Sequence, residues 1–193
     1  KTPIAVLGAP GITEFASAGE GPIRGAHLMA GLLYVVSGAR LYSISNAATP
    51  VVTLLGTGVS GSGVVAMADN DDQIMIVNGT NGYVYTAAAG FQLVTDADFH
   101  AANTVAFLNQ FFLFDWAGTN KWFRSDLLDG TAYDSTAFAS AEASSDRVLA
   151  VVAYKEIAYI FGQATIEPWA NNSAANFPFQ RIEGAGITRG VVG

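Results

Sequence analysis

The chain has 193 residues, of which 51% are hydrophobic and 13% are charged, and its formal net charge is -7. Average soluble domains carry about 25% charged residues, so this apolar composition excludes a disordered chain. The absence of cysteine excludes a disulfide framework, a thiolate zinc site and a cysteine nucleophile.

One sequence phrase occurs four times: an apolar strand, a turn containing glycine, and a second strand with aromatic side chains. The copies span residues 32–44, 74–85, 111–123 and 157–169. Their turn glycines, Gly38, Gly79, Gly118 and Gly162, are 41, 39 and 44 residues apart. A short apolar strand is predicted before each phrase, at 27–30, 64–68, 104–108 and 148–154, and another after it, at 51–55, 91–95, 136–139 and 179–182. Each repeat therefore contains four predicted strands.

Four antiparallel strands that recur every 40 to 45 residues are typical of a β-propeller blade. Apolar runs such as VVAMA (64–68) and FFLF (111–114) fit sheets that are buried on both faces. We therefore predict an all-β fold, a β-propeller built from four-stranded antiparallel blades and part of a larger propeller, with little helix. A closed four-bladed ring is the alternative. Pro168 lacks a backbone donor and is expected at an edge strand or a bulge.

The repeats divide the chain into successive segments. We expect an N-terminal segment at 1–26, blades at 27–63, 64–102, 103–146 and 147–183, and the start of a further blade at 184–193. The apolar run that begins near residue 191 and the missing initiator Met lead us to expect that the native protein is longer.

The glycines of residues 56–61 match the pattern G-x-G-x-x-G after a predicted strand. A dinucleotide fingerprint opens a helix at that point, and Gly63 and the turn at 69–70 leave no room for one. We predict a connection between blades instead.

Two acidic strings resemble metal-binding sequences. Asp69, Asp71 and Asp72 begin like a calcium loop, but Ile74 and Thr80 stand where an EF-hand needs glycine and glutamate. We therefore favour a solvated turn.

The second string is Asp96, Asp98 and His100, a D-x-D-x-H spacing suited to a metal on one side of a strand. A polar connection between blades is the favoured interpretation. The sequence thus predicts no metal site and no cofactor-binding site.

No combination of residues favours catalysis. His27 and His100 are the only histidines, and no G-x-S-x-G elbow accompanies them, which argues against a serine hydrolase. A propeller glycosidase needs paired carboxylates, for which the candidates are Glu156 with Glu167, or Asp126 with Asp129. Nothing distinguishes these acids from surface turns, so we predict that the protein is not an enzyme and has no catalytic residues.

Three tryptophans and two glycosylation sequons have structural explanations. Trp116, Trp122 and Trp169 lie in corresponding regions of the third and fourth phrases, which predicts packing between blades. The sequons at 78–80 and 171–173 matter only in a chain secreted by a eukaryotic pathway, and turn chemistry accounts for the first.

Several strings resemble the packaged-DNA stabilisation proteins of short-tailed bacteriophages: residues 21–45, 64–86, 138–172 and 177–190. The most specific are the NGTNGY turn (78–83) and FPFQRIEGA (177–185). The resemblance implies a virion structural protein, a tail hub or head-completion component in a ring below the portal that helps retain packaged DNA. Implied partners are portal or adaptor and tail proteins, copies of itself in a ring, and genomic DNA in the channel bound without sequence specificity. The residues themselves argue against a membrane partner, because the longest stretch without charge, 41–68, holds thirteen Ser, Thr, Asn, Gly or Pro residues among its 28 and is not expected to span a membrane as a helix. The implied location is the tail or portal vertex, and the host cytoplasm during assembly.

Charge suggests how such a protein would meet DNA. Residues 69–146 hold eleven acidic and two basic side chains. If this region lines a channel, like-charge repulsion would prevent DNA from sticking. Two other functions remain open, a cellular propeller scaffold for protein interactions and a glycan-active propeller.

Overall fold

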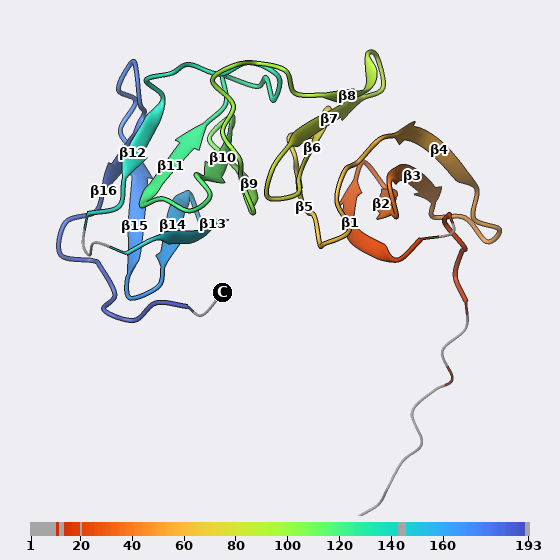
Figure 1. Ribbon diagram of the computed structural model, residues 1–193, viewed down its shortest axis with the longest axis horizontal. Helices are drawn as coiled ribbons and strands as arrows, with labels where there is room; N and C mark the ends of the chain where they lie inside the picture. Colours follow the sequence, from red (N-terminus) through yellow and green to blue (C-terminus); the bar gives the residue numbers. More distant parts are fainter. Residues whose placement is uncertain (1–10, 12–13, 20, 143–145, 192–193) are drawn as a thin grey trace, which may run out of the picture.

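The computed structural model describes residues 11, 14–19, 21–142 and 146–191. Within these ranges the chain forms sixteen β-strands and no helix. The strands make four separate four-stranded antiparallel sheets that follow one another along the chain (Figure 1). The predicted all-β propeller fold with four-stranded blades is therefore confirmed.

Each blade is a meander in which consecutive strands pair. The strands of the first blade are β1 (Ile23–Met29), β2 (Leu32–Ser37), β3 (Arg40–Ser45) and β4 (Val52–Thr57). Those of the second are β5 (Ala66–Asp69), β6 (Gln73–Val77), β7 (Gly82–Thr86) and β8 (Gly90–Leu93). Those of the third are β9 (Val105–Leu108), β10 (Phe111–Asp115), β11 (Lys121–Arg124) and β12 (Phe138–Ser140). Those of the fourth are β13 (Val148–Tyr154), β14 (Ile157–Gly162), β15 (Ile166–Asn171) and β16 (Phe179–Arg181).

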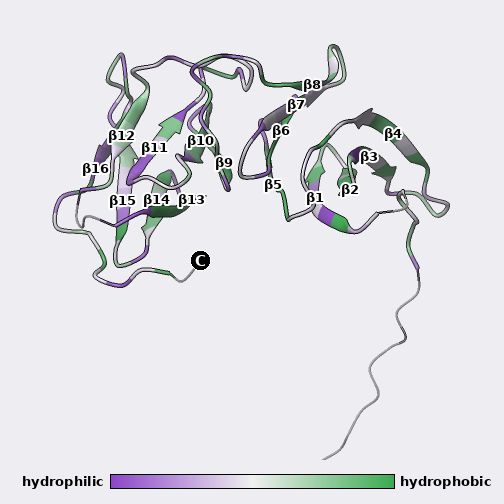
Figure 2. Ribbon diagram, in the orientation of Figure 1, coloured by the Kyte–Doolittle hydropathy of each residue, from purple (hydrophilic) through white to green (hydrophobic). Residues whose placement is uncertain are grey.

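The second strand of a blade carries the apolar runs that the sequence pointed to. Every residue from Ile74 to Val77 in β6, and from Phe112 to Asp115 in β10, is buried. Successive side chains of a strand point to opposite faces, so these sheets are covered on both sides. The hydropathy colouring accordingly shows green segments along the strands (Figure 2).

The hydrophobic core lies between consecutive blades. One cluster joins Tyr34 and Val36 of the first blade to Ile74 and Ile76 of the second. The next two clusters join the second blade to the third and the third to the fourth. The first strands of neighbouring blades, β1 with β5, β5 with β9, and β9 with β13, also contact one another. The blades are thus held together by their faces.

The turns between the second and third strands use glycine where the backbone requires it. Gly38, Gly79 and Gly118 have φ angles of 55°, 87° and 80°, a left-handed conformation that favours glycine. Gly162, the fourth glycine of the series, instead ends β14, where an added Cβ would lie 2.5 Å from a carboxylate oxygen of Asp146. Glycine at this position therefore allows Asp146 to approach the end of β14 closely.

Three placements differ from the sequence expectations. Strand β1 begins at Ile23, four residues before the expected start of the first blade. Within the expected further blade, Ile187 forms an isolated bridge with Ile166 of β15, and the Val191 N–H donates to the Gly162 carbonyl, so these two residues contact the fourth sheet. Pro168 lies in β15, the third strand of its sheet, and at neither an edge strand nor a bulge.

The interior position of Pro168 has a simple geometric reason. Its carbonyl accepts a hydrogen bond from the Ile182 N–H at 2.9 Å, just beyond the end of β16. The N and the carbonyl of one residue in an antiparallel strand point to the same side. The side of Pro168 that lacks an N–H therefore lies at the end of the β15–β16 ladder. Few hydrogen bonds between these strands are lost there.

Candidate functional site

The junction between the third and fourth blades combines a buried aromatic cluster with a hollow at its outer rim. An aromatic cluster fills it: Trp122 of β11 packs against Trp169, Phe177 and Phe179, with ring centroids 4.9 to 5.5 Å apart. Trp122 is fully buried. The predicted role of Trp122 and Trp169 in packing between blades is therefore confirmed.

Arg124 ties the same junction together. Its guanidinium lies over the ring of Phe111, 4.7 Å from the centroid, and donates a 2.6 Å hydrogen bond to the Asn176 carbonyl of the fourth blade. Asp126 lies 3.5 Å from the guanidinium. A charged side chain thus bridges the connection before β16 to the end of β11.

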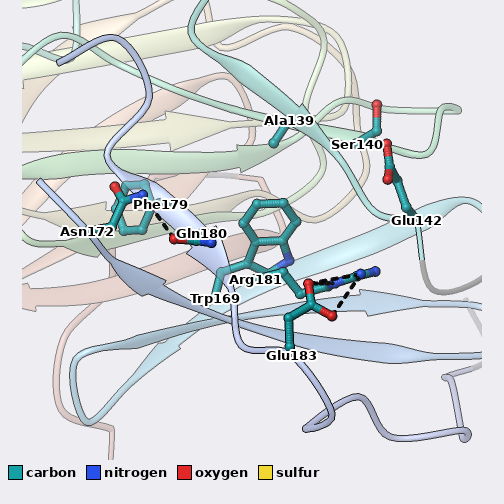
Figure 3. A pocket seen from close by; sticks show the side chains of 9 residues that line it. All are labelled: Ala139, Ser140, Glu142, Trp169, Asn172, Phe179, Gln180, Arg181 and Glu183. Atoms are coloured by element: carbon teal, nitrogen blue, oxygen red, sulfur yellow. Dashed lines mark hydrogen bonds and ion pairs between the residues drawn. The ribbon is translucent and has the colours of Figure 1, made fainter. Parts of the chain in front are cut away.

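A hollow of about 360 Å³ opens at the outer rim of this junction, between the outermost strands β12 and β16 (Figure 3). We call it the rim hollow. The indole of Trp169 forms its floor, and the Arg181 guanidinium donates to the Glu183 carboxylate at 3.1 Å. This hydrogen bond raises the pKa of Arg181, which keeps the side chain charged. Its lining residues are Ala139, Ser140, Glu142, Trp169, Asn172, Phe179, Gln180, Arg181 and Glu183.

The rim hollow suits binding better than chemistry. Its ion pair, amides and aromatic ring can contact another polypeptide, but its lining includes no histidine, cysteine or pair of interacting carboxylates. General acid–base or nucleophilic catalysis requires a nucleophile or a base within hydrogen-bonding reach of a partner. We therefore regard this hollow as part of a contact surface.

Acidic side chains gather at one end of the blades. In a meander, the turns after the first and third strands lie at the same end of the sheet. These connections hold six carboxylates and one lysine: Asp71, Asp72, Asp126, Asp129, Asp134, Glu156 and Lys155. We call this the hairpin end. Hydrogen bonds join its blades, from Asn70 to the Leu128 carbonyl at 3.3 Å and from Asn109 to Glu156 at 2.7 Å.

The glycine-rich string at 56–61 is a connection between blades, as expected. Gly56 and Thr57 end β4, and the rest leads to β5. An added Cβ at Gly56 would lie 2.3 Å from the ring of Phe91, so this glycine permits the first and second blades to pack closely. The string therefore serves packing.

A buried arginine that the sequence did not single out fixes this connection. The Arg24 guanidinium donates to the carbonyls of Gly38, Val59, Ser60 and Gly63 at 2.6 to 3.1 Å. Arg24 is 5% exposed. An arginine near the start of a strand resembles any surface cation in sequence, so its role becomes visible only when the connection folds over it.

The candidate metal ligands are used within the protein. Asp69 lies 2.5 Å from Nε2 of His27 and so links the first two blades, while Asp71 and Asp72 are exposed in the following turn. Within the described ranges, no three His, Cys, Asp or Glu residues are grouped so that they could hold a metal ion.

The side chains at 96–100 likewise form local contacts within the protein. Asp96 accepts hydrogen bonds from the N–H groups of Asp98 and Tyr133. His100 stacks on Trp116, with ring centroids 3.4 Å apart and planes within 7°. Partial burial lowers the pKa of His100, and Lys121 lowers it further against the opposing influence of Asp98.

The first candidate carboxylate pair lies too far apart for a glycosidase site. Glu156 lies in the turn before β14, and buried Glu167 pairs with Ile160 four residues further along the sheet. At about 3.3 Å per residue the two acids are roughly 13 Å apart, beyond the roughly 10 Å limit for paired catalytic carboxylates. Asp126 and Asp129 face each other in one turn, where Asp129 accepts from Thr131.

The first sequon lies in a turn, and the second begins at the last residue of β15. The Asn78 side chain accepts hydrogen bonds from the N–H groups of Thr80 and Asn81, and Asn171 accepts from Ser173. The described ranges contain no helix that could cross a membrane.

A family model described as "Bacteriophage P22 Gp10, beta-propeller" matches residues 5–193. The chain belongs to this phage stabilisation family. It is therefore a structural protein of the phage virion built as a β-propeller, in agreement with the resemblance noted in its sequence. No curated protein matches the chain.

Solved structures resemble the fold at low sequence identity. The computationally designed Ika4 protein aligns with a TM-score of 0.58 and 14% identity over 82% of this chain and 98% of its own. Human WBSCR16 aligns with a TM-score of 0.59 and 10% identity over 88% of this chain and 55% of its own. A structural genomics protein of unknown function from Bacteroides thetaiotaomicron VPI-5482 aligns with a TM-score of 0.56 and 14% identity over 88% of this chain.

The chain is short beside several of these structures. It spans 45% of the Bacteroides protein and 45% of the designed Ika8 protein, at TM-scores of 0.56. Similarity at this identity concerns the fold alone.

Proposed function

We propose that the protein is a tail-hub or head-completion component that assembles with other copies below the portal, contacts portal or adaptor and tail proteins, and helps retain packaged DNA. The observation that carries this proposal is the family match over residues 5–193. The described side chains agree with it, because they form contact surfaces and no reactive arrangement. We propose that the protein acts without turning over a substrate.

The charge of the hairpin end supports a weak, non-adhesive interaction with DNA. Six carboxylates against one lysine give it a net charge of -5 by formal count. Tight binding to a duplex depends on cations that displace the counterions of its phosphates. We expect the hairpin end, if it faces the channel, to let DNA pass without adhering.

Labelling the protein in intact virions tests its location. We expect gold-labelled antibody against this chain to mark the portal vertex, and heads that lack the protein to lose their packaged DNA. Label spread over the capsid shell, or heads that keep their DNA without the protein, would contradict the proposal.

A binding measurement tests the role of charge separately. At physiological salt, a fluorescent duplex should show no saturable binding to the protein in the micromolar range. A variant with lysine at Asp71, Asp72 and Glu156 should gain salt-sensitive binding, because each added cation displaces counterions. Micromolar affinity of the unaltered protein would contradict the proposed repulsion.

A further inference from the structure

A groove crosses the hairpin end between the third and fourth blades. It consists of two hollows of about 400 and about 540 Å³. The hollows share three lining residues: Phe111 at the start of β10, Leu127 in the β11–β12 connection and Ala175 in the β15–β16 connection. We call the two together the hairpin groove. Both of its walls belong to blades that this chain contains.

Two consecutive leucines of the β11–β12 connection are exposed. Leu127, which lines both hollows, is 57% exposed, and Leu128 is 49% exposed. Leu128 has a φ angle of 56°, a left-handed conformation that a bulky side chain rarely adopts. Together with the half-buried ring of Phe111, Leu127 gives the groove an apolar surface. Exposed apolar surface that is rimmed by polar residues marks a contact site for another molecule.

Hydrogen bonds from neighbouring connections fix the leucines in place. The Leu128 N–H donates to the Gln110 carbonyl at 2.8 Å, and the Leu128 carbonyl accepts from the Asn70 side chain of the second blade at 3.3 Å. Two residues further on, the Gly130 N–H donates to Oε1 of Gln73 at 2.8 Å. Because this connection is already ordered, a partner that binds to it does not lose affinity by ordering it.

Carboxylates surround the groove. Asp126 and Asp129 line it, and the Asp126 side chain is 50% exposed. Exposed Glu156 of the fourth blade accepts a 2.7 Å hydrogen bond from Asn109, another lining residue. Arg124, the one cation among the described lining residues, is 8% exposed and donates to two backbone carbonyls. The groove therefore presents negative charge beside an apolar surface.

We propose that the hairpin groove binds an extended segment of a partner protein in which large apolar side chains alternate with lysine or arginine. The apolar side chains pack on Phe111 and Leu127, and the cations pair with the carboxylates of Asp126 and Asp129. Exposed Asn171 on the opposite wall offers a polar side chain to the backbone of the segment.

Charge complementarity selects this occupant. Carboxylates attract a cationic polypeptide and repel both nucleic acid and an acidic segment. A second copy of this chain, whose net charge is -7, is repelled over most of its surface. The inference does not rest on the proposed place of the protein in the virion, because the peptide measurements below and the labelling of virions can each fail without the other.

The size of the groove sets the expected strength. A contact this small belongs with weak, transient interfaces, so a short peptide should bind with a dissociation constant of about 10 to 100 µM. The affinity should fall as salt is added, because salt screens the exposed charges.

Fluorescence anisotropy of a labelled peptide, GSKLRLKSG, mixed with the 193-residue chain tests the inference. We expect saturable binding at least about tenfold tighter than that of two control peptides. The first, GSELELESG, keeps the leucines and reverses the charge. The second, GSKSRSKSG, keeps the charge and lacks the leucines.

Substitutions in the groove locate the contact. Leu127→Ser should weaken binding of GSKLRLKSG about tenfold and Asp126→Asn about threefold, because they remove an apolar contact and an exposed charge pair. Leu93→Ser, at a 50% exposed leucine of β8, and Asp72→Asn, at an exposed acid of the second blade, are the matched controls. Both controls should bind the peptide as the unaltered protein does, and circular dichroism should show that all four variants fold.

Amide chemical shifts give a second, direct readout. In ¹H–¹⁵N spectra, GSKLRLKSG should shift the signals of residues 109–111, 126–129 and 171–175 before any others. Absence of saturable binding up to about 1 mM peptide, the weak end of measurable affinity, would overturn the inference. Equal binding of the three peptides, or binding that Leu127→Ser and Asp126→Asn leave unchanged, would overturn it as well.

Discussion

Trp122 and Trp169 meet edge to face across the junction of the third and fourth blades, with ring centroids 5.3 Å apart and planes at 77°. We expect Trp122→Ala to destabilise the protein by about 3–5 kcal/mol, as for a large aromatic removed from a core. Denaturant unfolding followed by far-ultraviolet circular dichroism measures the change.

Trp116→Ala is the comparison for this prediction. Trp116 is only partly buried and stacks on His100, so its removal should cost clearly less. Equal losses of stability in the two variants would show that packing of Trp122 at this junction contributes no more than the contacts of Trp116.

Arg24 should be more important than its place near the start of β1 suggests. Its guanidinium donates to four backbone carbonyls that hold the connection between the first two blades. Arg24→Met leaves those carbonyls unpaired, and we expect a loss of about 2–3 kcal/mol. Hydrogen exchange of residues 58–65 should accelerate in this variant. Arg147→Met, at an exposed arginine, is the control and should change neither quantity.

Gly56 should not tolerate a side chain. Because a Cβ would lie 2.3 Å from the ring of Phe91, Gly56→Ala forces the first two blades apart, and overpacking of this kind costs about 1–3 kcal/mol. At Gly63 no atom lies within 4 Å of an added Cβ. Thermal unfolding should therefore separate Gly56→Ala from a nearly unchanged Gly63→Ala, and similar midpoints would refute the packing role.

His100 should make stability depend on pH. Burial lowers its pKa in the folded protein below the ordinary value of 6.5, so the unfolded chain binds the proton first as pH falls. Stability should therefore decline as the pH drops from about 6.5 through the folded-state pKa, and this contribution should be constant above that window.

His100→Gln should flatten this decline in thermal midpoints measured between about pH 7 and pH 5, the range around an ordinary histidine pKa. His27→Gln controls for the other histidine, which lies against Asp69. A slope that His100→Gln leaves unchanged would rule out the stacked imidazole as its source.

Periodicity alone determined the architecture. The spacing of Gly38, Gly79 and Gly118 marks the turns, and apolar runs such as Ile74–Val77 report burial on two faces. These signals are local, because turn geometry and strand alternation depend on a few adjacent residues. They also sufficed to set aside the glycine string at 56–61 as a nucleotide site.

Only the folded structure shows which residues pack between neighbouring blades. The four carbonyls around Arg24, the close approach of Gly56 to Phe91 and the interior position of Pro168 each join residues that are distant in sequence or depend on where a neighbouring strand ends. The hairpin groove belongs to the same class. Its walls come from connections of the third and fourth blades, and only the arrangement of these blades brings Leu127 beside the β15–β16 connection.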